Sequence, residues 1–155
     1  MREDVEIVEM PELRVAAVRH SGPYSEISRA FGQLGQAAGA AGLFGPGSAM
    51  IAIYHDDPRT TPASELRSEA GVVIAEGLTI PAGLVETRIH GGRFARTIHT
   101  GPYDELPAIW QEFQGEGLAQ VGQRRRSGAS FEIYRNTPGQ VPDEDLVTEL
   151  YIPVG

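Results

Sequence analysis

The sequence has no cysteine, no lysine and no long apolar run. Without cysteine, the chain has no disulfide framework, no thiolate nucleophile and no cysteine-ligated zinc site. No apolar stretch approaches the roughly 20 residues that a membrane-spanning helix requires. The N-terminal segment MREDVEIVEM carries acidic side chains where a secretory signal would carry a basic patch and an apolar core. We therefore expect a cytoplasmic protein without a membrane partner.

Positive charge is also scarce. The formal net charge is −8, and the one run of basic residues, Arg124–Arg126, precedes a strand-like segment and is interpreted as part of a solvated loop. Because phosphate contacts need clustered cations, we exclude direct nucleic-acid binding. An acidic protein instead attracts cations, including organic ones.

The sequence lacks the patterns that mark cofactor and metal sites. It has no EF-hand, P-loop or dinucleotide-binding glycine pattern, and its histidines do not have the spacing of a zinc or iron site. We therefore predict no cofactor and no metal. A length of 155 residues with 41% hydrophobic and 22% charged residues predicts one soluble globular domain over residues 1–155, which we expect to be a monomer.

The most informative feature present is an internal repeat. The pentapeptide His-Ser-Gly-Pro-Tyr at 20–24 recurs 79 residues later as His-Thr-Gly-Pro-Tyr at 99–103. One residue is then inserted, and an offset of 80 residues matches Tyr54 with Tyr134, Leu66 with Leu146, and Glu69 with Glu149. A register kept over this much chain indicates a tandem duplication, with repeats of about 5–75 and 84–154.

Both copies predict the same order of elements. A strand at 15–20 or 94–99 ends in the Ser/Thr-Gly-Pro-Tyr turn, where glycine supplies an unusual φ and proline presets the first helical turn. A helix follows at about 24–41 or 103–121, because apolar residues recur three and four positions apart. The remaining strands are expected at 49–54 and 69–75, and at 130–135 and 147–152. Within each copy, a further extended segment precedes the first strand, at about 5–10 and 84–90.

Two such β-α-β-β units predict an α+β fold. Each unit is too small to bury its sheet face alone, so we expect the two to pack about a pseudo-twofold axis. The expected product is an antiparallel sheet with both helices on one face. A cleft where duplicated halves join is a favoured place for a small-molecule site, so a central ligand cleft is part of the prediction.

Several segments resemble the GyrI-like family, which includes DNA gyrase inhibitors and the effector-binding domains of multidrug-responsive regulators. They are the two pentapeptides at 20–24 and 99–103, IYHDDP at 53–58, LRSEAGV at 66–72 and LVTELYIPV at 146–154. The resemblance implies a duplicated fold, a central cleft and a glutamate on the last strand that faces the ligand, which matches Glu149. The position of Glu69 is commonly aspartate in the family, so the first copy departs slightly. Without room for a helix-turn-helix, the chain is similar to the stand-alone members.

Glu149 is the leading candidate for a ligand contact. Alternation along its strand places Glu149 and Tyr151 on one face and Leu150 and Ile152 on the other, which we expect to face the helices. The alternative is an ordinary solvent-facing carboxylate. A carboxylate in a dry cleft is costly until a cation pairs with it. We therefore expect an apolar, cationic and aromatic ligand.

Aromatic residues supply candidate walls for the same ligand. The predicted ligand-binding set is Glu149, Tyr151, Trp110, Tyr134, Tyr54 and Glu69. Trp110 and its neighbour Phe113 equally fit core packing, and the two tyrosines fit either a cleft rim or the core. Because His20 and His99 occur in both copies, we interpret them as structural.

Three functions follow from this interpretation. The first is a stand-alone protein that binds cationic aromatic compounds for sensing, sequestration or resistance. The second, implied by a few family members, is a hydrolase of cyclopropane-type electrophilic toxins in which Glu149 activates water. The third is inhibition of DNA gyrase through protein–protein contact.

Overall fold

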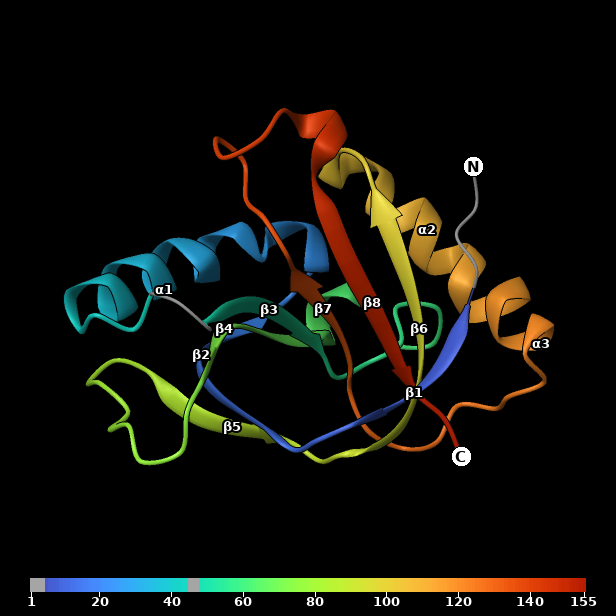
Figure 1. Cartoon of the computed structure of the whole chain (residues 1–155), viewed down its shortest axis with the longest axis horizontal. Helices are drawn as coiled ribbons and strands as arrows, with labels where there is room; N and C mark the ends of the chain where they lie inside the picture. The colour runs from blue at the N-terminus through green and yellow to red at the C-terminus, as the bar shows by residue number, and fades with distance from the viewer. Residues whose placement is uncertain (1–4, 45–47) are drawn as a thin grey trace. The chain divides into compact units, whose positions relative to one another are not determined.

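The structure is a computed structural model that describes residues 5–44 and 48–155, and its fold is α+β. The chain forms two compact units, residues 12–90 and a second one in which β1 (Glu6–Met10) joins residues 91–155. Each unit is a four-stranded antiparallel sheet with helical segments on one face (Figure 1). The predicted α+β fold with an antiparallel sheet is confirmed. The central cleft stays a prediction.

In the unit of residues 12–90, the strand order is β3-β4-β2-β5. The N-cap residue Ile27 and the α1 residues Phe31, Leu34 and Ala38, at spacings of three and four, pack on one face of these strands. Figure 1 shows α1 running along that face. The elements are β2 (Leu13–Ser21), α1 (Ser28–Ala40), β3 (Ala49–Tyr54), β4 (Arg67–Ile74) and β5 (Val85–Ile89), with 3-10 turns at Tyr24–Glu26 and Ala63–Glu65.

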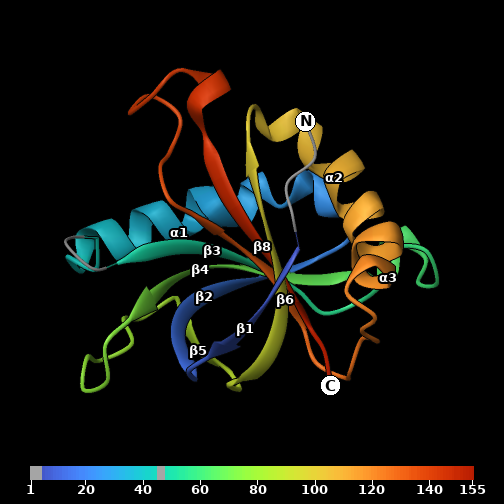
Figure 2. The ribbon, with the colours of Figure 1, turned by 45° about the vertical axis from the view of Figure 1, so that its right-hand side comes forward.

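In the other unit, the strand order is β1-β6-β8-β7. Leu106, Phe113 and Leu118 of the helical run pack on Leu150 and Ile152 of β8, and Figure 2 shows this run beside β6. The elements are β6 (Gly92–Thr100), α2 (Leu106–Glu112), a π-helix (Phe113–Gly117), α3 (Leu118–Gln120), β7 (Ser130–Tyr134) and β8 (Val147–Pro153), with 3-10 turns at Tyr103–Glu105 and Asp143–Asp145.

Strand register confirms the repeat. His20 of β2 lies opposite Ser68 of β4, and its counterpart His99 of β6 lies opposite Thr148 of β8. Ile53 pairs with Glu69 in β3 and β4, just as Ile133 pairs with Glu149 in β7 and β8. The two offsets found in the sequence, 79 and 80 residues, therefore relate equivalent strand positions in the two units.

The repeated turns are built as predicted. Gly22 and Gly101 have φ values of 119° and 147°, which L side chains rarely adopt. Their amides donate to the carbonyls of Leu66 and Leu146 at 2.8 Å, so each turn is fastened to the residue before β4 or β8.

The second helix differs from the prediction of one continuous helix over 103–121. The structure has α2, then a π-helical segment, then the short α3. Gly115 and Gly117 lie in the π segment, where glycine tolerates the wider turn. In both repeats, the first residues after proline form a 3-10 turn, so the α-helices begin at Ser28 and Leu106.

The two outer strands are exchanged between the repeats. β1 precedes β2 in the sequence, but it pairs with β6, with Val8 opposite Phe94. β5 precedes β6, but it pairs with β2, with Thr87 opposite Val15. The compact units therefore differ from the sequence repeats by one strand each.

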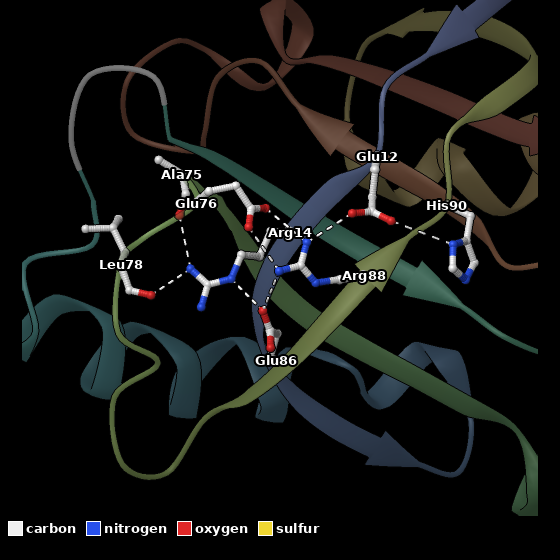
Figure 3. A network of polar contacts seen from close by, with 8 residues as sticks. All are labelled: Glu12, Arg14, Ala75, Glu76, Leu78, Glu86, Arg88 and His90. Atoms are coloured by element: carbon white, nitrogen blue, oxygen red, sulfur yellow. Dashed lines mark hydrogen bonds and ion pairs between the residues drawn. The ribbon is translucent and has the colours of Figure 1, made fainter.

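An ion-pair network holds β5 against β2 (Figure 3). Arg14 of β2 donates to Glu86 of β5 at 2.5 Å and to the carbonyls of Ala75 and Leu78 at 3.1 and 2.6 Å. Arg88 of β5 bonds Glu12, Glu76 and Glu86 at 3.0 to 3.2 Å. The network also fastens the chain after β4 to the edge of the sheet.

No helix among the described residues is both long enough and apolar enough to span a bilayer.

Candidate functional site

The most distinctive polar side chain of the second unit is Glu132 in the middle of β7. Its residue is only 2% exposed although it carries a carboxylate. Leu150, its neighbour on β8, packs against the helical run, so Glu132 also lies on the helix-facing side of the sheet. The hydrogen bond that Glu132 receives from α2 agrees with this placement.

Aromatic side chains surround the Glu132 carboxylate. The Trp110 indole Nε1 donates to Oε1 at 2.5 Å, and the Tyr134 hydroxyl donates to Oε2 at 2.6 Å. The ring of Tyr103 lies 5.4 Å from the ring of Tyr134, centroid to centroid. Burial, and then the negative charge of Glu132, raise the pKa of Tyr103 above its ordinary value. We call Glu132, Trp110, Tyr134 and Tyr103 the Glu132 cluster.

The Glu132 cluster is closed by partly exposed rings. Trp110, Tyr134 and Tyr103 are half-buried, whereas the carboxylate beneath them is buried. Trp110 also packs on Phe113, with ring centroids 5.9 Å apart, and Phe113 belongs to the core as expected.

Glu149 and Tyr151 lie on the opposite face of the same sheet. Their neighbours Leu150 and Ile152 contact the helical run, in agreement with the predicted alternation. The Tyr151 hydroxyl donates to Glu149 Oε1 at 2.5 Å, and Arg135 forms an ion pair with Oε2. Glu149 therefore has a cation of its own in this structure.

Tyr151 is packed as a core residue on that face. Its ring stacks on Phe131 with centroids 4.7 Å apart and meets the edge of Phe94 at 6.3 Å. Burial raises the pKa of Tyr151 to about 12, helped by the bonded Glu149 carboxylate and opposed by the nearby Arg96 guanidinium.

Glu69 occupies the position in the first unit that Glu149 occupies in the second. The carboxylate is buried and bonds His55 Nε2 at 2.6 Å and Thr87 Oγ1 at 2.5 Å. Burial alone would raise the pKa of Glu69, but the hydrogen bonds from His55 and Thr87 lower it below its ordinary value. His55 matches Arg135 at the offset of 80 residues, so each of these two glutamates meets a basic side chain from the residue after β3 or β7.

The other predicted site residues are distributed over both units. Tyr54 packs on Tyr24, with ring centroids 4.7 Å apart, in the first unit. Its counterpart Tyr134 packs on Tyr103 in the second. The structure thus brings Trp110 together with Tyr134, and Glu149 together with Tyr151, but places these two pairs on opposite faces of one sheet. Among the residues with described positions, no three His, Asp and Glu side chains gather as metal ligands.

The sequence matches the family described as the GyrI-like small molecule binding domain over residues 3–155. The chain belongs to this family. A DNA gyrase inhibitor of Yersinia enterocolitica is 31% identical over 136 residues, which cover 84% of the chain and 85% of the relative.

Solved structures share the GyrI-like fold over almost the whole chain. The C-terminal domain of EcmrR superimposes with a TM-score of 0.80 at 20% identity, covering 100% of this chain and 99% of that domain. SAV2435 bound to tetraphenylphosphonium gives a TM-score of 0.71 at 13% identity, covering 98% and 94% of the two chains.

Sequence reasoning on this GyrI-like chain missed Glu132, although the repeat carries a signal for it. The counterpart of Glu132 at the offset of 80 residues is Ala52, which is fully buried. A carboxylate at a position where the other copy holds a buried alanine marks a departure from pure core packing. Trp110 also differs from its counterpart, Phe31, because its indole has an N–H group that can donate a hydrogen bond.

Proposed function

We propose that this GyrI-like domain binds an aromatic organic cation at the Glu132 cluster. The observation that carries the proposal is a carboxylate that is 2% exposed and lies among three aromatic side chains of one unit. Such an arrangement offers a negative charge and ring faces within one small volume. Its ligand is a flat or bulky cation with an apolar surface.

Electrostatics favours a cation at this position. A buried carboxylate is costly in a medium of low polarity, and a cation that enters the cluster offsets part of that cost. Each ring face within about 6 Å of the cation adds roughly 0.5–2 kcal/mol of attraction. Trp110 and Tyr134 supply such faces once they turn from the carboxylate toward the ligand.

Glu149 and Glu69 each lie beside a basic side chain. A ligand cation at Glu149 would compete with Arg135, and one at Glu69 would compete with His55. The similarity to SAV2435, which was solved with tetraphenylphosphonium, supports a lipophilic cation as the ligand of this fold. We place the ligand charge at Glu132 because its carboxylate is buried among aromatic side chains, and the Glu149→Gln variant tests the alternative position.

Trp110 provides the test, because it is the single tryptophan of the chain. Titration with tetraphenylphosphonium should change Trp110 fluorescence in a saturable way. Glu132→Gln keeps the shape but removes the charge, and we expect it to weaken binding at least about tenfold, as loss of a charged partner in a buried site does. Glu149→Gln, on the opposite face of the same sheet, is the matched control and should leave the affinity unchanged.

The reverse result decides against Glu132. If Glu149→Gln loses binding while Glu132→Gln keeps it, the ligand lies on the face away from the helices. If the titration leaves Trp110 fluorescence unchanged and isothermal calorimetry detects no binding, the proposal that the domain binds an aromatic cation is wrong.

A second candidate function is inhibition of DNA gyrase by direct contact. The relative from Yersinia enterocolitica carries that name and covers most of the chain, and the net charge of −8 suits contact with a basic, DNA-handling protein. A supercoiling assay tests it. The purified chain should inhibit gyrase in proportion to its concentration, and Glu132→Gln should inhibit equally well if the contact surface is separate from the cluster.

A further inference from the structure

Two buried polar groups of the second unit lie on the helix-facing side of its strands, beside the Glu132 cluster. They are the Thr148 hydroxyl of β8, in a residue that is fully buried, and Nε2 of His99 in β6. Within 5–44 and 48–155, neither atom has a hydrogen-bond partner. His99 Nε2 is 3.1 Å from Glu105 Oε1, but this is an ion pair only when the imidazole is protonated, and its geometry is not that of a hydrogen bond.

The strand register places these groups next to the cluster. Thr148 lies directly between His99 of β6 and Tyr134 of β7. Tyr134 in turn bonds Glu132. Glu132 is the diagonal neighbour of Thr148, two residues along the strand pair, and such neighbours on one face are about 7–8 Å apart. One continuous row therefore runs from the Glu132 carboxylate to the Thr148 hydroxyl and the His99 imidazole.

Buried hydroxyl and imidazole groups almost always have a partner in folded proteins. A threonine hydroxyl both donates and accepts, and a neutral imidazole does the same at its two nitrogens. A ligand hydroxyl placed between Thr148 and His99 can donate to one of them and accept from the other. A ligand carbonyl can accept from either.

We propose that Thr148 and His99 form a polar subsite for the ligand of the Glu132 cluster. This inference rests on the proposed function and narrows its ligand class. The ligand is an aromatic cation that carries a hydroxyl or carbonyl group about 7–8 Å from its charge, a spacing set by the diagonal of the strand pair. The charge lies at Glu132, the ring lies against Trp110 and Tyr134, and the polar group reaches Thr148.

The first repeat supplies an internal comparison. Ser68, the counterpart of Thr148, is also buried between a histidine and a tyrosine, and the described residues give its hydroxyl no partner. There, however, His20 Nε2 lies 3.1 Å from the Pro23 carbonyl, and Ala52 takes the place of Glu132. The first unit thus has the hydroxyl without the charge, and Ser68 serves as the matched control.

The test uses two probes that differ by one hydroxyl group. They are phenethyltrimethylammonium and its 4-hydroxy derivative, titrated against the full chain with Trp110 fluorescence and calorimetry. We expect the hydroxylated probe to bind about tenfold more tightly, because a site with unpaired polar groups discriminates strongly for a ligand that pairs them. Thr148→Val should bind the hydroxylated probe only as tightly as the plain probe. Its affinity for the plain probe should equal that of the wild type. Ser68→Ala should change neither.

Stability measurements separate recognition from folding. Thr148→Val removes an unpaired hydroxyl without changing the shape, so its melting temperature should equal or exceed that of the wild type. If Thr148→Val folds poorly, Thr148→Ala repeats the comparison with a smaller side chain.

The possible failures are distinguishable. Equal binding of both probes by the wild type overturns the subsite while leaving the Glu132 proposal intact. The subsite is also overturned if Thr148→Val lowers the affinity for both probes by the same factor. If neither probe nor tetraphenylphosphonium binds, the proposed function fails and the subsite fails with it.

Discussion

At the scale of single residues, Glu69 shows how hydrogen bonds from neighbouring side chains keep a buried carboxylate ionised. His55 and Thr87 bond its two oxygens and lower its pKa below 4.5 despite burial. Because the folded pKa is depressed, the stabilisation is complete above about pH 4.5 and is lost as the pH falls through the folded value. We expect Glu69→Gln to be less stable than wild type by about 1–3 kcal/mol at pH 7. Urea unfolding followed by circular dichroism should show this difference.

The same titration supplies its own control. The difference between Glu69→Gln and wild type should shrink as the pH falls below about 4.5 and through the depressed pKa of Glu69, because the wild-type carboxyl then becomes neutral as well. Glu65→Gln changes an exposed carboxylate in the turn before β4 and should leave the free energy of unfolding at pH 7 nearly unchanged. A difference that is constant over the whole pH range would show that the ionised form of Glu69 contributes nothing.

Residue positions could be predicted from the sequence where alternation along a strand determines them. Glu149 and Tyr151 were placed on one face and Leu150 on the other, and the structure agrees. The partners of these residues could not be predicted, since Arg135 reaches Glu149 through the register of two strands, which the sequence alone does not fix. Glu132 was missed because one acidic residue within a short apolar strand gives no periodic signal.

At the scale of elements, the equivalent strands β4 and β8 differ in side-chain size at one position, which holds glycine in β4 and tyrosine in β8. Tyr151 of β8 stacks on Phe131, whereas its counterpart in β4 is Gly71. A Cβ at Gly71 would lie 2.3 Å from Val15 Cγ1 and 3.1 Å from the Ala16 carbonyl oxygen. Gly71→Ala should therefore destabilise the protein by about 1–3 kcal/mol through overpacking. A urea titration measures this loss.

A glycine with open space around it is the matched control. Gly115 in the π-helical segment has no atom within 4 Å of an added Cβ. Gly115→Ala should be neutral or stabilise the fold by up to about 1 kcal/mol, because alanine restricts the unfolded chain and favours helix. Equal losses in the two variants would contradict the steric argument.

The helices and strands themselves were largely predictable, because spacings of two, three and four residues reflect which face is buried. The π-helical segment was not. It inserts a wider turn into a run whose apolar spacing fits one continuous helix, and Phe113 and Leu118 remain buried on both sides of it. Only the packing of the helical run on β6 and β8 reveals the extra residue.

At the scale of the whole molecule, the exchange of β1 and β5 decides where the chain can be divided. A cut at the repeat boundary, giving residues 1–80 and 81–155, separates β1 from β6 and β5 from β2. Residues 12–90 instead keep all four strands of one sheet and its helix. We expect the 12–90 fragment to keep more secondary structure than the 1–80 fragment, which has nearly the same length. Circular dichroism and size-exclusion chromatography measure this.

Mixing provides the complementary result. Residues 1–80 and 81–155 each carry the edge strand that the other lacks, so together they should form a complex with the circular dichroism spectrum of the intact chain. Independent folding of both fragments without association would contradict the exchanged pairing. The sequence predicted both extended segments but not their partners, since pairing depends on which sheet edge each strand reaches rather than on its own residues.

The exchange also bears on the origin of the duplication. In a protein with one copy and this strand order, the strand equivalent to β2 would pair with the strand equivalent to β4 on one side but would lack its outer neighbour. A second molecule could supply that neighbour with its strand equivalent to β1, and would receive the same strand in return. Two such molecules would form a reciprocally swapped homodimer. Fusion of their genes would then preserve every strand pair, remove the dependence of folding on protein concentration, and let the two copies diverge. In the present chain the two copies differ in this way at Ala52 and Glu132.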